Sequence, residues 1–359
     1  MLPRYKSDIL IYFYGLTLVF YKGLLGPIKP MDVLSIVILL LFLKERFHKA
    51  VVVLLLVPFS GLFQTIFSSI SGVNYGLSSV VRIAFGMVFI LAAYAVYRKG
   101  KVNVLLRGFI SGVLITGILA VLQKFGFIPG DYLLYRNSVA VNIQGFFSDP
   151  NRFAFAIFLS ALMIRIFPNL IQKRTLVLSL LGLVSLFVGS RTLLLLLPLI
   201  LFSGVSVRVL VPMLGFGGFL VIRYFDRLKS ALYIFSKLSE GGIDYRNDPR
   251  FRIFQRALES IQSNIFGSGI DAFALSSNLT SHNSFLELLL ISGLFGLISI
   301  LVAILYGFLK VRSWSTESAI YLFALTAYLA TINILFMGFA MTCLTILYLY
   351  AARVYSHKF

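Results

Sequence analysis

The sequence has few cysteine, histidine and acidic residues, and each shortage excludes a class of site. Its 359 residues include one cysteine, Cys343, and three histidines. A single cysteine excludes a disulfide scaffold, a zinc finger and an iron–sulfur centre, because each needs more than one thiolate. The 13 acidic residues include no Asp-x-Asp pair, so the metal ligands of a soluble sugar transferase are missing.

The motifs of nucleotide-driven and zinc enzymes are also missing. No glycine-rich loop ends in Gly-Lys-Ser or Gly-Lys-Thr, and no His-Glu-x-x-His occurs. We therefore expect neither a metal nor a cofactor.

Charged residues are scarce, and this shortage points to a membrane. They make up 13% of the chain against 59% hydrophobic residues, and the mean hydropathy is +0.94. Soluble domains carry about 25% charged residues, and disordered chains need low hydrophobicity, so both classes are excluded. The net charge of +19 falls in short clusters between apolar runs, which is typical of membrane proteins rather than of nucleic-acid binding.

A membrane-spanning helix needs about 20 mostly apolar residues. Runs of this kind predict an all-α, polytopic integral membrane protein, with about 12 transmembrane helices in one domain over 1–359. Two of the runs, 31–43 and 192–204, are short enough to be broken or re-entrant. The predicted spans are 9–26, 31–43, 50–68, 79–97, 103–125, 152–168, 175–190, 192–204, 207–222, 283–308, 318–336 and 338–352.

Basic residues follow the even-numbered spans and predict the orientation. Lysine and arginine are enriched in short cytoplasmic joins, which puts both termini in the cytoplasm. The residues concerned are Lys44, Arg46, Lys49, Arg98, Lys99, Lys101, Lys173, Arg174, Arg208, Lys310 and Arg312.

Two longer segments, 126–151 and 223–281, then lie on the outer side. The second is inserted between spans nine and ten, and we expect short helices in it. Its basic residues are six arginines, among them Arg250, Arg252 and Arg256, and two lysines. The planar guanidinium suits phosphate oxygens, so we interpret the segment as facing an anionic ligand; an ordinary solvated loop is the alternative.

His282 stands where this loop meets the apolar run 283–308. A histidine at a membrane–water boundary can accept a proton near neutral pH, which makes it a candidate general base. Glu287 lies one turn after Asn283 on the same helix face. A carboxylate in lipid is costly, so Glu287 should face the protein interior or a wet cavity.

Helix-start chemistry is a plainer explanation for several of these residues. Thr280 or Ser281 would be an N-cap, and Ser284 with Glu287 would form a capping box. Asp149 fits the same role before a helix that begins with proline.

Two further arginines lie at predicted outer ends of spans. Arg191 stands between two apolar helices, where an interfacial anchor is the alternative role. Arg82 lies one turn inside the run 79–97, from which it would snorkel outward or line a cavity. With Arg250, His282 and Asp149, these residues suit transfer from a lipid-linked diphosphate, because arginines stabilise the departing diphosphate and a histidine takes the acceptor proton.

The segment from 267 to 296 resembles the bacterial O-antigen ligase and polysaccharide polymerase superfamily. The shared features are Gly267-Ser268-Gly269, His282-Asn283 opening a helix, and Gly293-Leu294-Phe295-Gly296 within it. Upstream, Arg250 with Phe254 and Ala257 is similar to the family's Arg, aromatic, Ala pattern, although Phe254 stands where Trp is commoner. Gly189-Ser190-Arg191 and the segment 146–151 are similar as well, so the resemblance covers about residues 140–300.

The resemblance implies a metal-independent, inverting glycosyltransferase of the bacterial inner membrane. It would move a glycan from undecaprenyl diphosphate to an acceptor sugar on the outer face. His282 would be the base or would orient the acceptor, and Arg191 and Arg250 would hold the diphosphate. From their positions we add Arg82, Arg252 and Arg256 to the diphosphate site, and Asn283, Glu287 and Asp149 as supporting residues.

Within the family, scattered outer cations favour a polymerase of O-antigen, capsular or exopolysaccharide repeat units. The alternative is a ligase that transfers the glycan to lipid A–core. The expected partners are the lipid-linked oligosaccharide, the acceptor glycan or lipid A–core, membrane lipid and other polysaccharide-assembly proteins. A flippase of lipid-linked sugars is a third interpretation; it should show repeats and broken helices. A purely structural subunit would be indifferent to changes at His282 and Arg250.

Overall fold

The structure is a computed structural model, and the part of the chain that it describes is mostly helical. The predicted span 207–222 and most of 318–336 lie outside the described residues. These residues are 4–20, 29–43, 47–70, 77–136, 141–147, 149–167, 169–202, 249–269, 283–310, 321, 324–326, 328–329 and 337–351.

Apolar runs form the helices, as the sequence predicts. Within the described residues they are α1 (Arg4–Thr17), α2 (Pro30–Phe42), α3 (Lys49–Ile70), α4 (Leu77–Arg98), α5 (Val102–Lys124), α6 (Pro150–Ile166), α7 (Arg174–Val188), α8 (Arg191–Leu201), α12 (Pro249–Ser263), α14 (Ser284–Lys310) and α16 (Gly338–Ala351). Four stretches are long and apolar enough to cross a membrane: Lys49–Ile70, Val80–Arg98, Val102–Lys124 and Ser284–Ala303. An α-helical membrane fold is therefore supported, and the count of 12 spans stays a prediction.

The first helix differs from its predicted span, 9–26. It begins at Arg4 and ends at Thr17, so both ends lie earlier in the chain than predicted; the charged residues in its first turns account for the difference at the start. Asp8 forms an ion pair with Lys101 at the start of α5, with 2.7 Å between the charged atoms. A hydropathy profile cannot detect this pairing, so it places the start of the helix too late in the chain.

Glycines allow α1 and α5 to pack closely side by side. A Cβ atom at Gly15 would overlap the carbonyl oxygen of Leu105, and one at Gly108 would overlap that of Tyr12. Because Tyr12 lies beside Gly108 and Leu16 beside Gly112, the two helices run parallel. Small residues give such close backbone approaches in membrane helix pairs, and the parallel arrangement agrees with the predicted alternation of spans one and five.

α6 is the central helix of the main core. Every residue from Phe153 to Ile164 is buried, as expected for a helix that is apolar on all sides. It packs against α5, α7, α8 and α16.

A short antiparallel hairpin departs from the all-α prediction. Strands β1 (Leu134–Arg136) and β2 (Val141–Ile143) pair between α5 and α6, in the predicted outer segment 126–151. The Gln123 side chain holds the approach to β1 by donating to Pro129 O at 3.1 Å and accepting from Leu133 N at 2.9 Å. A single buried glutamine thus organises a segment that the sequence leaves as a loop.

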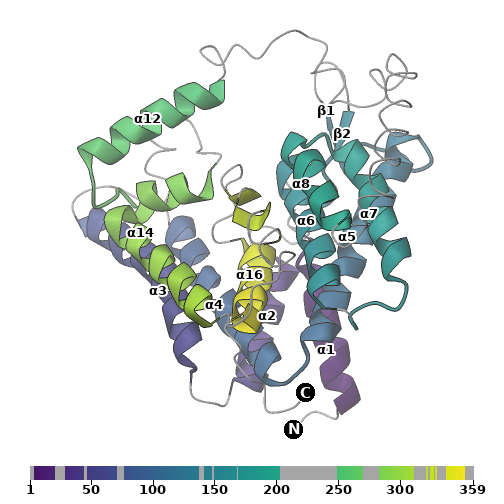
Figure 1. Cartoon of the computed structure of the whole chain (residues 1–359), viewed down its shortest axis with the longest axis horizontal. Coiled ribbons are helices and arrows are strands. Elements are labelled where there is room, and N and C mark those ends of the chain that lie inside the picture. Colours follow the sequence, from purple (N-terminus) through teal and green to yellow (C-terminus); the bar gives the residue numbers. More distant parts are fainter. Residues whose placement is uncertain are drawn as a thin grey trace.

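A second group of helices consists of α3, α4, α12 and α14. α3 packs against α4 and α14. α4 also packs against α2 and α16, and its Phe89, Ala92, Ala93 and Val96 belong to the main core, so α4 and α16 join the two groups. Figure 1 shows the hairpin and α12 at the same end of the molecule, opposite the start of α1. The candidate site residues are found at this end.

Candidate functional site

The arginine-bearing helix α12 lies on the first part of α14. Buried Ala257 packs against Leu286 and Leu290 of α14, flanked by half-buried Ile253 and Ile261. On either side of this contact, Phe254 and Arg256 are exposed. α12 is therefore held by one apolar strip, and the helix that carries Arg250, Arg252 and Arg256 runs beside the segment that follows His282.

α14 is interrupted at Gly293, so the predicted span 283–308 is apolar and long enough to cross a membrane but is not one continuous helix. Gly293 has φ 55° and ψ −142°, which is not helical. Figure 1 shows the part of α14 before the break running across the view beneath α12, whereas the rest runs along α3. The residues before Gly293 thus belong with α12, and only those after it continue as a helix through the bundle.

The segment that follows α12 fills this break with its own backbone. Ser268 N donates to Leu290 O at 2.8 Å, Gly269 N to Ile291 O at 2.9 Å, and Leu294 N to Ile265 O at 3.0 Å. Unpaired peptide groups are costly away from water, so a broken helix needs such partners. We name this arrangement of residues 264–269 and 290–294 the glycine junction.

Glycine is required at this junction because two backbones touch. A Cβ atom at Gly267 would lie 2.5 Å from Gly293 N, and one at Gly293 would overlap the backbone of Phe266 and Gly267. Both glycines, and Gly269 beside them, also have positive φ, which side chains disfavour. The glycines of the two family-like motifs therefore meet in space.

The start of α14 is capped by Asn283. Its Oδ1 accepts from Phe285 N at 2.9 Å and from Leu286 N at 3.0 Å. Asn283, and not Ser284, therefore caps the helix, which begins at Ser284; the alternative caps Thr280 and Ser281 lie outside the described residues. Glu287 follows one turn later and is half-buried.

Arg82 belongs to the same group of helices. It is exposed on α4, and the next residue, Ile83, is buried against Ile291 of α14 and Leu62 of α3. Ile291 is also part of the glycine junction. The sequence predicts that Arg82 lies on the same outer side as His282, and the contact of Ile83 with Ile291 brings this part of α4 beside α14.

Asp149 lies in a separate place, at the start of α6. Its side chain accepts from Asn151 N at 2.6 Å, with Pro150 in the first turn, so the predicted N-cap is confirmed. Buried Tyr328 packs on Phe155 and Phe158 of α6, interacts with the Ser190 side chain and lies within electrostatic reach of Asp149. The starts of α6 and α8 therefore share one buried tyrosine.

The Gly-Ser-Arg motif is the connection between α7 and α8. Gly189, at φ 74°, ends α7, and Ser190 caps α8 by accepting from Leu193 N at 3.4 Å. Arg191 is the first residue of α8, so its backbone lies next to the Tyr328 contact.

The predicted residues thus fall into two groups at one end of the molecule. Arg82, Arg256, Asn283 and Glu287 lie around α14, together with the backbone of Arg250 and Arg252 in α12. Asp149 and the backbone of Arg191 lie at α6 and α8. His282 is outside the described residues, directly before Asn283.

Two polar residues near these groups were not predicted. Gln64 stands inside the apolar run 50–68, and an amide in such a run is a signal that the sequence offers. The sequence around Tyr328 contains no comparable signal, because tyrosines are common throughout this chain.

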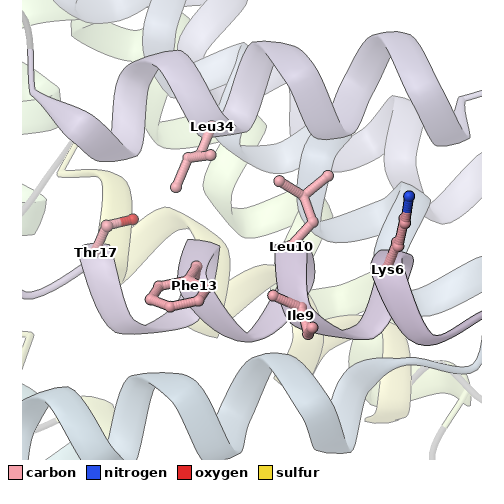
Figure 2. A pocket seen from close by; sticks show the side chains of 6 residues that line it. All are labelled: Lys6, Ile9, Leu10, Phe13, Thr17 and Leu34. Atoms are coloured by element: carbon pink, nitrogen blue, oxygen red, sulfur yellow. The ribbon is translucent and has the colours of Figure 1, made fainter. Parts of the chain in front are cut away.

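A surface pocket of about 540 Å³ lies elsewhere, between α1 and α2 (Figure 2). Its lining is almost wholly apolar, and it includes no predicted site residue. The lining residues are Lys6, Ile9, Leu10, Phe13, Thr17 and Leu34. In the part of the chain that is described, no group of three or more His, Cys, Asp and Glu side chains lies close enough to hold a metal ion.

Comparison with known proteins finds no match, either among protein-family models or among curated proteins.

Proposed function

We propose that this protein is a membrane glycosyltransferase that uses a polyprenyl-diphosphate-linked glycan as donor. In this proposal it spans the bacterial inner membrane about 12 times, with both termini in the cytoplasm. It transfers the glycan from undecaprenyl diphosphate to an acceptor sugar on the outer side, and it polymerises O-antigen, capsular or exopolysaccharide repeat units.

The observation that best supports the proposal is the packing of α12 on the start of α14. Ala257, Leu286 and Leu290 hold a helix with three arginines beside the residue that follows His282. The reaction needs positive charge for a departing diphosphate next to a proton acceptor. In this proposal the arginines of α12 meet the first requirement and His282 meets the second, and the packing of α12 on the start of α14 supports their proximity.

The proposed step is a displacement with inversion. The acceptor hydroxyl oxygen forms a bond to the anomeric carbon, and its proton passes to His282. The bond from that carbon to the diphosphate oxygen breaks, and its electron pair leaves with undecaprenyl diphosphate. Arg250, Arg252 and Arg256 on α12, with Arg82 and Arg191, stabilise the charge that develops there.

One observation favours a second candidate, a flippase of lipid-linked sugars. Transporters form their sites at discontinuous membrane helices, and α14 is broken at Gly293. In this chain, however, the backbone of residues 265–269 closes the break. The glycosyltransferase is therefore the main proposal, and a transfer assay distinguishes it from the flippase.

The deciding experiment is a transfer assay on the purified protein in lipid, with a chelator and without nucleotide. It receives undecaprenyl-diphosphate-linked repeat unit, and the products are separated by size. A ladder of longer lipid-linked glycans is expected. A single transfer that needs lipid A–core would instead make the protein a ligase, and no product in either case would favour the flippase.

Variants then test the site. His282→Ala and Arg250→Ala should abolish the ladder while the protein still inserts and folds. His357→Ala is the matched control, because it removes another histidine near the predicted cytoplasmic end of the chain. Unchanged product from His282→Ala would remove this residue from the mechanism.

A further inference from the structure

We propose that Gln64 of α3 is a positioning residue that fixes the arginine helix α12 relative to the membrane-spanning bundle. Neither the proposed transfer reaction nor the family-like motifs involve Gln64. Its role in the reaction rests on the proposed function, whereas its role in holding α12 does not.

The side chain of Gln64 is joined directly to the glycine junction. It is buried, with 7% of its surface exposed, and its Nε2 donates to Gly267 O at 2.8 Å. Asn264, one residue after the end of α12, donates to the same carbonyl at 2.8 Å. One carbonyl oxygen thus connects the end of α12 with the middle of α3.

This contact is well placed to control both partners of the candidate site. α12 ends just before the junction, and the first part of α14 ends inside it, at Gly293. The two segments also pack against each other through Ala257, Leu286 and Leu290. They therefore form one unit, and Gln64 attaches this unit to α3.

The attachment resists displacement because the site around it is buried. If Gln64 were replaced by an apolar residue, the Gly267 carbonyl would keep its hydrogen bond from Asn264 but lose its hydrogen bond to α3, and the end of α12 would lose this polar link to the bundle. The junction could then shift on α3, and α12 would shift with it. The three junction hydrogen bonds lie between the two segments themselves. The apolar packing of α14 along α3 also holds the unit to the bundle, and the Gln64 hydrogen bond fixes where Gly267 and the end of α12 lie on α3.

The first test measures the position of α12 without any assay of function. The natural Cys343 is buried and free, so a new cysteine pair, Ala257→Cys with Leu286→Cys, gives a clean disulfide across the α12–α14 contact. The second pair, Leu62→Cys on α3 with Ile291→Cys on α14, reports the distance between α3 and the junction. It leaves Gln64 and Gly267 unchanged, so the junction is kept.

We expect Gln64→Leu to slow disulfide formation in the Leu62–Ile291 pair by about tenfold, the change that loss of one buried hydrogen bond gives. The Ala257–Leu286 pair should change by less than about twofold, because α12 and α14 move together. Ser68→Ala is the matched control: Ser68 is the other, longer partner of Gln64, at 3.4 Å, and its loss leaves the Gly267 contact in place. Equal rates in Gln64→Leu and wild type would overturn the proposal.

The second test asks whether the position matters for the reaction. In the transfer assay, Gln64→Leu should raise the KM for the lipid-linked donor by about tenfold and change kcat by less than about twofold, since misplaced arginines weaken donor binding. A general loss of folded protein would lower kcat per total protein and leave KM unchanged, and that result would overturn the role in the reaction. If the wild type shows no transfer at all, the proposed function fails, while the disulfide rates still decide the positioning of α12.

Discussion

Among single residues of the candidate site, Arg256 and Asp149 have different roles. Arg256 is exposed beside a packed strip, so its guanidinium serves no visible structural purpose in α12. Asp149 is committed to a backbone hydrogen bond of 2.6 Å at the start of α6. The first residue is therefore a candidate for ligand binding, and the second is first of all a helix cap.

We predict that Arg256→Gln weakens donor binding without loss of stability. A hydrogen bond to a charged group contributes about 1.5–3 kcal/mol, which corresponds to roughly a tenfold or larger rise in KM for the lipid-linked donor. Gln255→Ala, next to it and also exposed, is the control and should behave as wild type. An equal rise in KM for both variants would assign the effect to the helix rather than to the charge.

For Asp149 we predict that the cap and not the charge stabilises the protein. Asp149→Ala should lower the free energy of unfolding by about 1 kcal/mol, whereas Asp149→Asn should stay within a few tenths, because asparagine caps as well as aspartate. Thermal unfolding in detergent measures both. If Asn is as destabilising as Ala, the charge itself is needed at this position.

At the scale of elements, the glycine junction is the feature that organises the site. A helix interrupted at Gly293 would leave peptide groups unpaired, and the chain solves this with residues 265–269. The arrangement permits no side chain at Gly267 or Gly293. It converts one long apolar run into a surface piece under α12 and a bundle helix along α3.

We predict that Gly293→Ala destabilises the protein by about 3 kcal/mol, since its backbone conformation is nearly exclusive to glycine and the new methyl group overlaps residues 266 and 267. Gly182→Ala in α7 is the control. There a Cβ atom meets only Leu201 Cδ1, at 3.4 Å, so we expect a gain of about 0.5–1 kcal/mol from reduced chain entropy. A Gly293→Ala protein that unfolds at the wild-type temperature would contradict the described junction.

For the molecule as a whole, the described helices form a main core around α6 and a second group around α14, and α4 and α16 contact both. The parallel pair of α1 and α5 and the ion pair of Asp8 with Lys101 place the starts of both helices at one end. α12 and the hairpin lie at the other end (Figure 1). The proposed orientation would put the first end in the cytoplasm and the second on the outer side.

Labelling from outside the cell tests the orientation. Gln255→Cys on α12 should react with a membrane-impermeant thiol reagent in intact cells. Lys99→Cys, exposed after α4, should react only after the membrane is opened, and the wild type should stay unlabelled because Cys343 is buried. The reverse pattern for the two cysteines would invert the proposed topology and exclude an outer-face reaction.

Most of the described apolar helices and their approximate ends could be predicted from the sequence, because apolar length and composition decide what a bilayer can hold; α1, which lies earlier than its predicted span, is an exception. It also determined the Asp149 cap, since an Asp-Pro pair at a helix start acts through neighbouring backbone alone. Apolar helices and helix caps can be predicted in this way because they depend on residues that are neighbours in the sequence.

The break at Gly293, the hairpin after α5 and the approach of Arg82 to α14 could not be predicted from hydropathy. The break depends on residues 265–269, and the approach of Arg82 depends on the contact of Ile83 with Ile291, so both need partners from distant segments. The hairpin depends on hydrogen bonds of the Gln123 side chain to Pro129 and Leu133, which hydropathy does not describe. A hydropathy profile averages over neighbours in sequence and carries no record of contacts between distant segments. Whether a run of apolar residues continues as one helix or bends at a glycine therefore depends on which backbone is available to pair with it.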